Sequence, residues 1–124
     1  MRIVFPFALP TLNEYINAER TNRYMAAHIK KMTEQRLVFY IQSQTRERFQ
    51  EPVFIKYKWI RKDARHDKDN IAFAKKFVQD ALVKAGVIPN DGWKNIVGFS
   101  DEFEIGKTDE LWVEIEEVNY EDKH

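Results

Sequence analysis

The sequence contains no cysteine, no long run of apolar residues and no net charge. The absence of cysteine excludes disulfides, thiolate metal sites and cysteine nucleophiles, and it fits the reducing environment of the cytoplasm. No stretch approaches the ~18 apolar residues of a membrane span, and the apolar run at the N-terminus is too short for a signal peptide. We therefore expect a cytoplasmic protein with no membrane partner.

The zero net charge hides two halves of opposite sign. Residues 1–66 contain 13 Lys and Arg against 6 Asp and Glu, a net charge of +7. Residues 67–124 contain 7 against 14, a net charge of −7. Asymmetry of this kind points to contact with nucleic acid, although the two halves can also neutralise each other within the fold.

Length and pattern predict a single domain over residues 1–124 with one core, since 44% of the residues are apolar. Periodicity and turn residues predict a strand, a short helical piece, a long helix, a strand, a second helix and two strands. Their expected ranges are Arg2–Phe7, 14–17, 22–49, Val53–Ile60, 70–86, Ile96–Phe99 and Leu111–Val118, with a frayed tail from about residue 120. This order predicts an α+β (mixed α/β) fold in which a small mixed β-sheet packs against two main helices.

The clearest chemical pattern is acidic and surrounds the second helix. Asp67 and Asp69 lie one residue apart just before it, and Asp91 follows its far end. In an extended segment, residues i and i+2 project to the same side, so both of the first two carboxylates are expected to point one way. If the chain folds back after the helix, Asp91 can join them around a hard cation such as Mg²⁺.

A purely structural interpretation of the same residues remains open. Asp69 or Asn70 can cap the helix, and Asn90-Asp91-Gly92 is typical of an ordinary turn. An Asp-x-Asp pair by itself is a weak signal. On this interpretation the protein neither responds to metal nor binds DNA.

One lysine is suited to work beside such a site. Lys76 lies seven residues after Asp69, two turns along the same helical face. Its ammonium can approach the metal site or neutralise charge on a scissile phosphate. Alternatively, Lys76 pairs with Asp80 four residues later, which makes Asp80 a structural partner and not a metal ligand.

With these residues in place, the chain resembles the RusA family of Holliday junction resolvases, which is common in bacterial prophages. The resemblance covers residues 53–118 well and the opening strand more loosely. The Leu12–Tyr15 segment looks like the start of a RusA-like subfamily from phages of Gram-positive bacteria. The spaced pattern is far more specific than any of its pieces; it consists of Asp67-Lys68-Asp69-Asn70, Lys76, Asp80-Ala81-Leu82, Lys84-Ala85-Gly86 and Asn90-Asp91.

The resemblance implies a homodimeric endodeoxyribonuclease that cuts four-way DNA junctions symmetrically with Mg²⁺ or Mn²⁺. It implies that Asp67, Asp69 and Asp91 are catalytic metal ligands and that Lys76 is the catalytic lysine. The segment between Asp69 and Lys76 is longer here than in the best-known members, so Lys75 stays a competing assignment. The basic run before Asp67 is also thinner than in the family.

Basic residues are the candidates for holding DNA, since contacts to phosphate set affinity and carry no direct sequence information. They are Arg20, Arg23, Lys30, Lys31, Lys56, Lys58, Arg61, Lys62, Arg65 and Lys75. A second interpretation keeps this binding surface without catalysis, as a structure-selective DNA-binding dimer of the same fold. The acidic triad argues against it, because a pure binder gains nothing from three carboxylates beside a phosphate.

Overall fold

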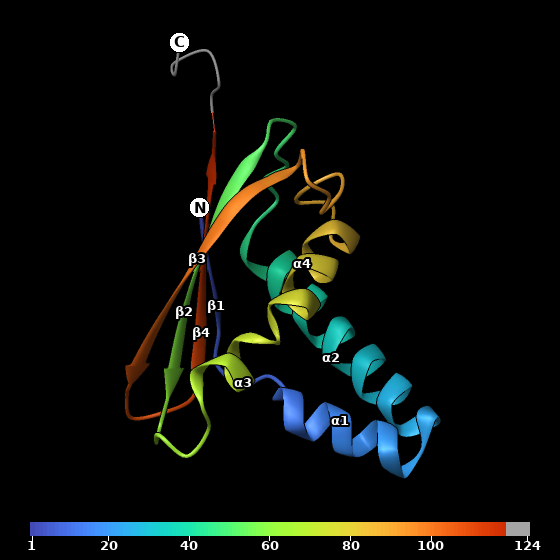
Figure 1. Ribbon diagram of the computed structural model, residues 1–124. Helices are drawn as coiled ribbons and strands as arrows, with labels where there is room; N and C mark the ends of the chain where they lie inside the picture. The colour runs from blue at the N-terminus through green and yellow to red at the C-terminus, as the bar shows by residue number, and fades with distance from the viewer. Residues whose placement is uncertain (119–124) are drawn as a thin grey trace.

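Four strands form one mixed sheet, and the helices pack on one side of it (Figure 1). The structure is a computed structural model that describes residues 1–118. The predicted tail from about residue 120 lies outside this range. Strands and helices occur in the order β1 (Arg2–Phe5), α1 (Leu12–Thr21), α2 (Arg23–Gln44), β2 (Val53–Arg61), α3 (Lys68–Ala72), α4 (Lys75–Lys84), β3 (Ile96–Ile105) and β4 (Glu110–Glu117). The predicted α+β class is confirmed.

The strand order across the sheet is β1-β4-β2-β3. β4 runs antiparallel to both β1 and β2, whereas β2 and β3 run parallel. Parallel neighbours need a crossover connection, and α3 and α4 provide it between β2 and β3. The crossover places these two helices beside β3, at the edge of the sheet where the candidate functional site lies.

Alternation along the strands divides the sheet into a buried face and an open face. On β2 the buried side chains Val53, Ile55, Tyr57 and Trp59 all point towards the helices. They meet fully buried residues of the helices, including Leu37 of α2. This layer is the hydrophobic core, and its burial is the main source of stability.

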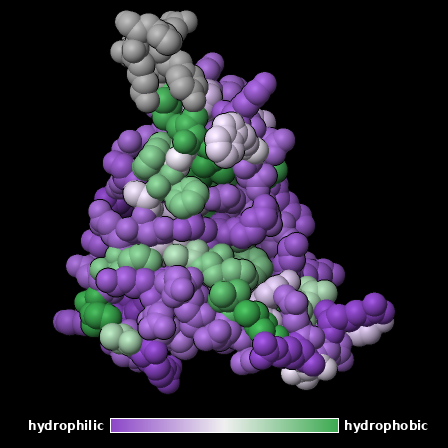
Figure 2. Space-filling model, viewed as in Figure 1, coloured by the Kyte–Doolittle hydropathy of each residue, from purple (hydrophilic) through white to green (hydrophobic). Residues whose placement is uncertain are grey.

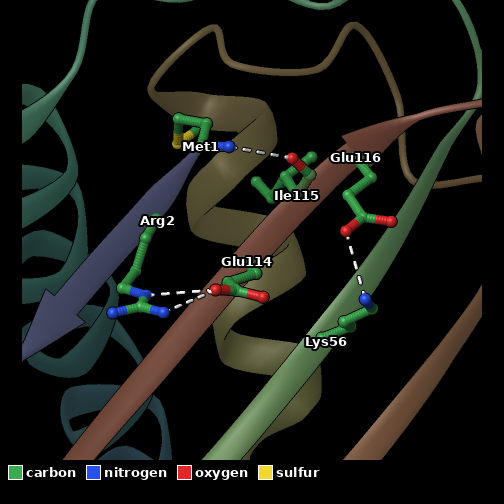
Figure 3. Close-up of polar contacts among 6 residues, drawn as sticks. All are labelled: Met1, Arg2, Lys56, Glu114, Ile115 and Glu116. Atoms are coloured by element: carbon green, nitrogen blue, oxygen red, sulfur yellow. Dashed lines mark hydrogen bonds and ion pairs between the residues drawn. The ribbon is translucent and has the colours of Figure 1, made fainter.

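The open face is polar, and ion pairs join its neighbouring strands. Arg2 on β1 pairs with Glu114 on β4 at 2.8 Å, and Lys56 on β2 pairs with Glu116 at 3.1 Å. Figure 3 shows both pairs, with the hydrogen bond from the N-terminal ammonium of Met1 to the carbonyl of Ile115. Arg2 holds the pKa of the Glu114 carboxyl below its ordinary value, and the Glu116 carboxylate raises the pKa of Lys56.

Three predicted boundaries in the first half were wrong. The opening strand ends at Phe5, the first helix is a ten-residue helix and not a short piece, and α2 ends at Gln44 and not near Phe49. The early end of α2 has a tertiary cause. The Phe49 amide donates to the Val87 carbonyl at 2.7 Å, so residues 45–52 run along the end of α4 instead of continuing the helix.

The predicted single helix over residues 70–86 is two helices, α3 and α4, with a break at Phe73 and Ala74. No proline or glycine marks this break. Aromatic packing accompanies it, because Tyr15 of α1 lies against both Phe73 and Phe77, with ring centroids 5.7 and 5.9 Å apart. The Gly86 end was predicted correctly, and Gly86 has a φ of 83°, which glycine adopts without strain.

β3 is longer than predicted, ten residues instead of the four of Ile96–Phe99. Its second half, Asp101–Ile105, is rich in carboxylates and therefore gave a weak strand signal. Pairing with β2 in register, from Phe54 opposite Gly98 to Arg61 opposite Ile105, extends it. The extension places Asp101 and Phe103 on the same face as the core residues of β2.

Candidate functional site

A groove runs between β3 and the α3–α4 crossover. It consists of two adjoining cavities of about 630 and 660 Å³, which share Gln79 and Phe99 in their walls. We call their union the β3–α4 groove. The first cavity is lined by Lys68, Asp69, Ala72, Phe73, Lys75, Lys76, Gln79, Phe99, Asp101 and Phe103. The second is lined by Pro52, Gln79, Asp91, Gly92, Trp93, Lys94, Ile96, Val97, Gly98 and Phe99.

The two neighbouring aspartates differ in their place in the fold. Asp67 occupies the N-cap position of α3 but makes no side-chain capping bond, and Asp69 already lies in the first helical turn. The expectation that both lie in an extended segment was wrong, because α3 begins at Lys68. Residues two apart in a helix do not face each other. Asp69 lines the groove, and both aspartates are exposed to solvent.

Neither Asp69 nor Asn70, the two residues predicted to cap the helix, caps the start of α3 with its side chain. The Asp69 carboxylate accepts a hydrogen bond at 2.9 Å from the amide of the next residue, Asn70. The buried Asn70 side chain instead accepts from the Asn13 amide at 2.9 Å. Asn70 therefore ties α3 to the start of α1 and positions Asp69 at the groove.

Lys76 lines the first cavity and reaches towards Asp91, which lines the second. Its Nζ lies 2.9 Å from Asp80 Oδ1 and 3.0 Å from Asp91 Oδ2. The predicted pairing of Lys76 with Asp80 is confirmed, and the return of the chain after α4 brings Asp91 to the same ammonium. Hydrogen bonds that the Lys76 ammonium donates to Asp80 and to Asp91 raise the pKa of Lys76, and the same ammonium lowers the pKa of Asp91.

Lys75 lines the same cavity as Lys76 but has different partners. Its ammonium makes an ion pair with Asp101 of β3 and lies 4.4 Å from the centroid of the Phe99 ring. Trp59 Nε1 donates to the other oxygen of Asp101 at 2.8 Å. Both members of the ion pair are about four-fifths buried, so the contact is part of the wall of the groove.

Asp101 was not among the residues selected from the sequence. The signal that could have found it is the alternation of Phe99, Asp101, Phe103 and Ile105, in which one carboxylate interrupts an apolar strand face. A carboxylate on the inner face of a strand needs a partner. Lys75 and Trp59 are those partners.

The structure does not gather the three predicted metal ligands into one cluster. Among residues 1–118, no group of three or more Asp, Glu, His or Cys side chains lies close enough to hold a metal ion. Asp91 is instead engaged with Lys76, and Asp69 lies in the other cavity of the groove. Metal binding by Asp67, Asp69 and Asp91 stays a prediction.

The predicted DNA-binding residues are spread over several surfaces. Lys75 alone among them lines the groove, while Lys56 and Lys58 lie on the open face of the sheet in pairs with Glu116 and Glu104. Arg61 is largely buried and lies 3.9 Å from Asp109. The others are exposed on α1, on α2 or in the loop before α3; they are Arg20, Arg23, Lys30, Lys31, Lys62 and Arg65.

Comparison with known proteins leaves the family open. No protein-family model matches the chain, and no curated protein matches it significantly. The likeness to the RusA family accordingly stays a prediction based on the residues quoted above. No helix within residues 1–118 is long and apolar enough to cross a membrane.

Proposed function

We propose that the protein is a metal-dependent endodeoxyribonuclease that cuts branched DNA, such as four-way junctions, in paired strands. The observation that carries the proposal is the β3–α4 groove, which is lined by Asp69, Asp91, Lys75 and Lys76. Carboxylates that bind a cation and lysines that bind phosphate are the groups that phosphodiester cleavage requires.

The donor set fits a hard cation in its chemistry. Asp67 and Asp69 are solvent-exposed carboxylates, and oxygen ligands supplemented by water suffice for Mg²⁺ or Mn²⁺. Asp91, whose lowered pKa keeps it ionised, is the third residue that would hold the metal. When bound, a divalent cation supplies an activated water and stabilises charge in the transition state.

The two lysines take different roles in this proposal. Lys76 has a side chain that is 65% exposed, so its ammonium is free to exchange a carboxylate partner for a substrate phosphate. Lys75 is held by Asp101, whose other oxygen accepts from Trp59, so its charge is balanced within the wall of the first cavity. Of these two lysines, we therefore propose Lys76 as the catalytic one.

We include a homodimer in the proposal, because symmetric cuts across one junction need two sites. Its support is an apolar stripe on α2 made of Met25, Met32 and Phe39, which are 48%, 50% and 68% exposed. Their spacing of seven residues puts them on one helical face. Met32→Lys should dissociate the dimer in sedimentation equilibrium, whereas Ala27→Lys on another face of α2 should not.

The experiment that tests the function is cleavage of a synthetic four-way junction with linear duplex as competitor. Reactions contain Mg²⁺, Mn²⁺ or EDTA, and the wild type is compared with Asp67→Asn. Paired nicks that need metal and vanish in Asp67→Asn are the expected result. Tight junction binding without cutting would instead favour the non-catalytic DNA-binding dimer, and absence of both would contradict each of these functions.

A further inference from the structure

Trp93 is a large apolar residue that does not contribute to the hydrophobic core. It is 96% exposed, the highest value among the exposed large hydrophobic residues of the described chain. Within residues 1–118 it makes no aromatic stacking or cation–π contact. An isolated exposed apolar residue needs no explanation, but Trp93 lines the second cavity of the β3–α4 groove, two residues from Asp91.

Hydrogen bonds within the loop and to β2 hold the loop that carries Trp93. The amides of Asn95 and Ile96 donate to the Gly92 carbonyl at 3.0 and 3.1 Å, and the Val53 amide of β2 donates to the Asn95 carbonyl at 2.8 Å. Within the loop, the backbone amide of Asp91 also donates to the side chain of Asn90 at 2.7 Å. The loop thus presents the indole from a fixed backbone position, which lowers the entropy lost on binding a ligand.

Aromatic rings and lysines alternate along the groove beyond Trp93. Phe99, 50% exposed, lies in the wall shared by both cavities, and Phe103 lies in the first. The Lys75 ammonium lies over the Phe99 ring, and the Lys68 ammonium lies 5.9 Å from the centroid of the Phe103 ring. Lys94 follows Trp93 directly in the sequence. Figure 2 shows apolar patches on this view of the molecule interrupted by hydrophilic surface.

Aromatic faces for stacking combined with lysines for phosphates are the pattern by which proteins hold single-stranded nucleic acid. We infer that the Trp93–Phe99 part of the groove binds an unpaired nucleobase by stacking. This inference rests on the proposed function and specifies its substrate: DNA enters the groove with at least one base outside the duplex. Asp91 and Lys76 then lie beside the phosphate of that nucleotide.

A second copy of the chain fits this surface less well. The central part of a protein–protein interface is depleted of Lys and Asp, whereas the groove around Phe99 and Trp93 is lined by Lys75, Lys76, Asp91 and Lys94. The apolar stripe on α2, which contains no charged member, is the surface suited to a second copy. Nucleic acid is the occupant that uses both the rings and the charges.

The test measures binding of a single-stranded oligonucleotide, a four-way junction and a linear duplex in EDTA, where no strand is cut. Trp93→Ala should weaken binding of the first two by about tenfold or more, because stacking on each base contributes substantially, and leave the duplex nearly unchanged. Trp93→Phe should restore most of the affinity. The control, Ile105→Ala, removes an exposed apolar side chain of β3 that lines neither cavity of the groove, and it should have no effect.

Fluorescence of 2-aminopurine in the single strand gives a second readout, since stacking on Trp93 should quench it and Trp93→Ala should remove the quenching. Equal affinity of Trp93→Ala and the wild type for the single strand overturns the inference, even if junction cutting is intact. A change from dimer to monomer caused by Trp93→Ala also overturns it, because the surface would then be an interface between copies. Failure of the wild type to bind any of the three DNAs overturns both the inference and the proposed function.

Discussion

The two faces of the sheet carry the same kinds of charged residue and use them differently. On the open face, Arg2, Lys56 and Lys58 pair with glutamates of neighbouring strands, and most of these side chains are about half exposed. In the β3–α4 groove, Lys75 and Asp101 are largely buried and line a cavity beside aromatic rings. Exposed pairs are worth about 0–1 kcal/mol and are screened by salt, whereas charges in a partly enclosed groove keep their field.

The comparison separates a face whose charges pair between neighbouring strands from the groove where we propose that DNA is cut. The presence of lysine and carboxylate does not distinguish them, since both have these residues. Enclosure distinguishes them, because the α3–α4 crossover shields the inner face of β3. Variants placed in pairs, one on each face, can break or sharpen this distinction.

The largest difference should come from aromatic residues. Phe77→Ala removes a ring that is 5% exposed and packs on Tyr15 and Phe73, so we expect a loss of about 3–5 kcal/mol of unfolding free energy. Trp112→Ala on the open face removes a half-buried ring that lies below Arg2 and Lys58, and should cost less. Urea unfolding of both variants measures this; equal losses would mean that the open face also contributes to the core.

The next difference concerns the proposed cleavage of DNA. Lys76→Ala should reduce the rate of junction cutting by about 100-fold or more while junction binding stays close to wild type, as removal of one charged group at a transition state does. Lys58→Ala, which removes an open-face lysine paired with Glu104, should leave the cutting rate nearly unchanged. Single-turnover cleavage separates the rate from binding. A similar loss in both variants would show that the open face takes part in the reaction.

A smaller effect is expected from the carboxylate that binds Lys75. Asp101→Asn leaves an oxygen to accept from Trp59 Nε1 but removes the charge that pairs with a largely buried ammonium. We expect a loss of about 1–3 kcal/mol in unfolding free energy. Glu104→Gln, which loosens the exposed pair with Lys58, should change stability by less than about 0.5 kcal/mol. If both variants lose the same unfolding free energy, burial in the groove does not strengthen the ion pair between Lys75 and Asp101.

The smallest effect is a dependence on pH. Because the folded-state pKa of Asp91 lies below its unfolded value, its pairing with Lys76 stabilises the protein above about pH 4 and is lost as pH falls through the folded pKa. Since Lys76 is 65% exposed, the contribution should be below about 1 kcal/mol. The stability difference between wild type and Asp91→Asn should therefore shrink from pH 7 to pH 3 in urea unfolding. A difference that is constant over this range would contradict the pairing.

Glu114 on the open face offers a matched pH control. Arg2 lowers its pKa in the same direction, so Glu114→Gln should show a pH dependence of the same sign. Because each pair has a cation that is more than half exposed, both dependences should weaken in 0.5 M salt. A pH dependence of opposite sign in Glu114→Gln would contradict the pairing with Arg2.

Local patterns in the sequence were enough to predict the α+β class, the strand Val53–Ile60 and the end of the second helix. Each of these depends on neighbours within a few residues: alternation after Pro52 for the strand, and a glycine that accepts positive φ at position 86 for the helix. The pairing of Lys76 with Asp80 was predictable for the same reason, because four residues in a helix bring two side chains together.

Tertiary packing decided the features that define the groove. Contacts with Tyr15, distant in sequence, accompany the break between α3 and α4, and this break changes the direction of Asp69 relative to Lys76. Parallel pairing with β2 made β3 long enough to bring Asp101 to Lys75. These contacts join residues that are tens of positions apart, and no local periodicity records them. The sequence therefore supplied the charged and aromatic side chains, while long-range pairing decided which of them face the same cavity.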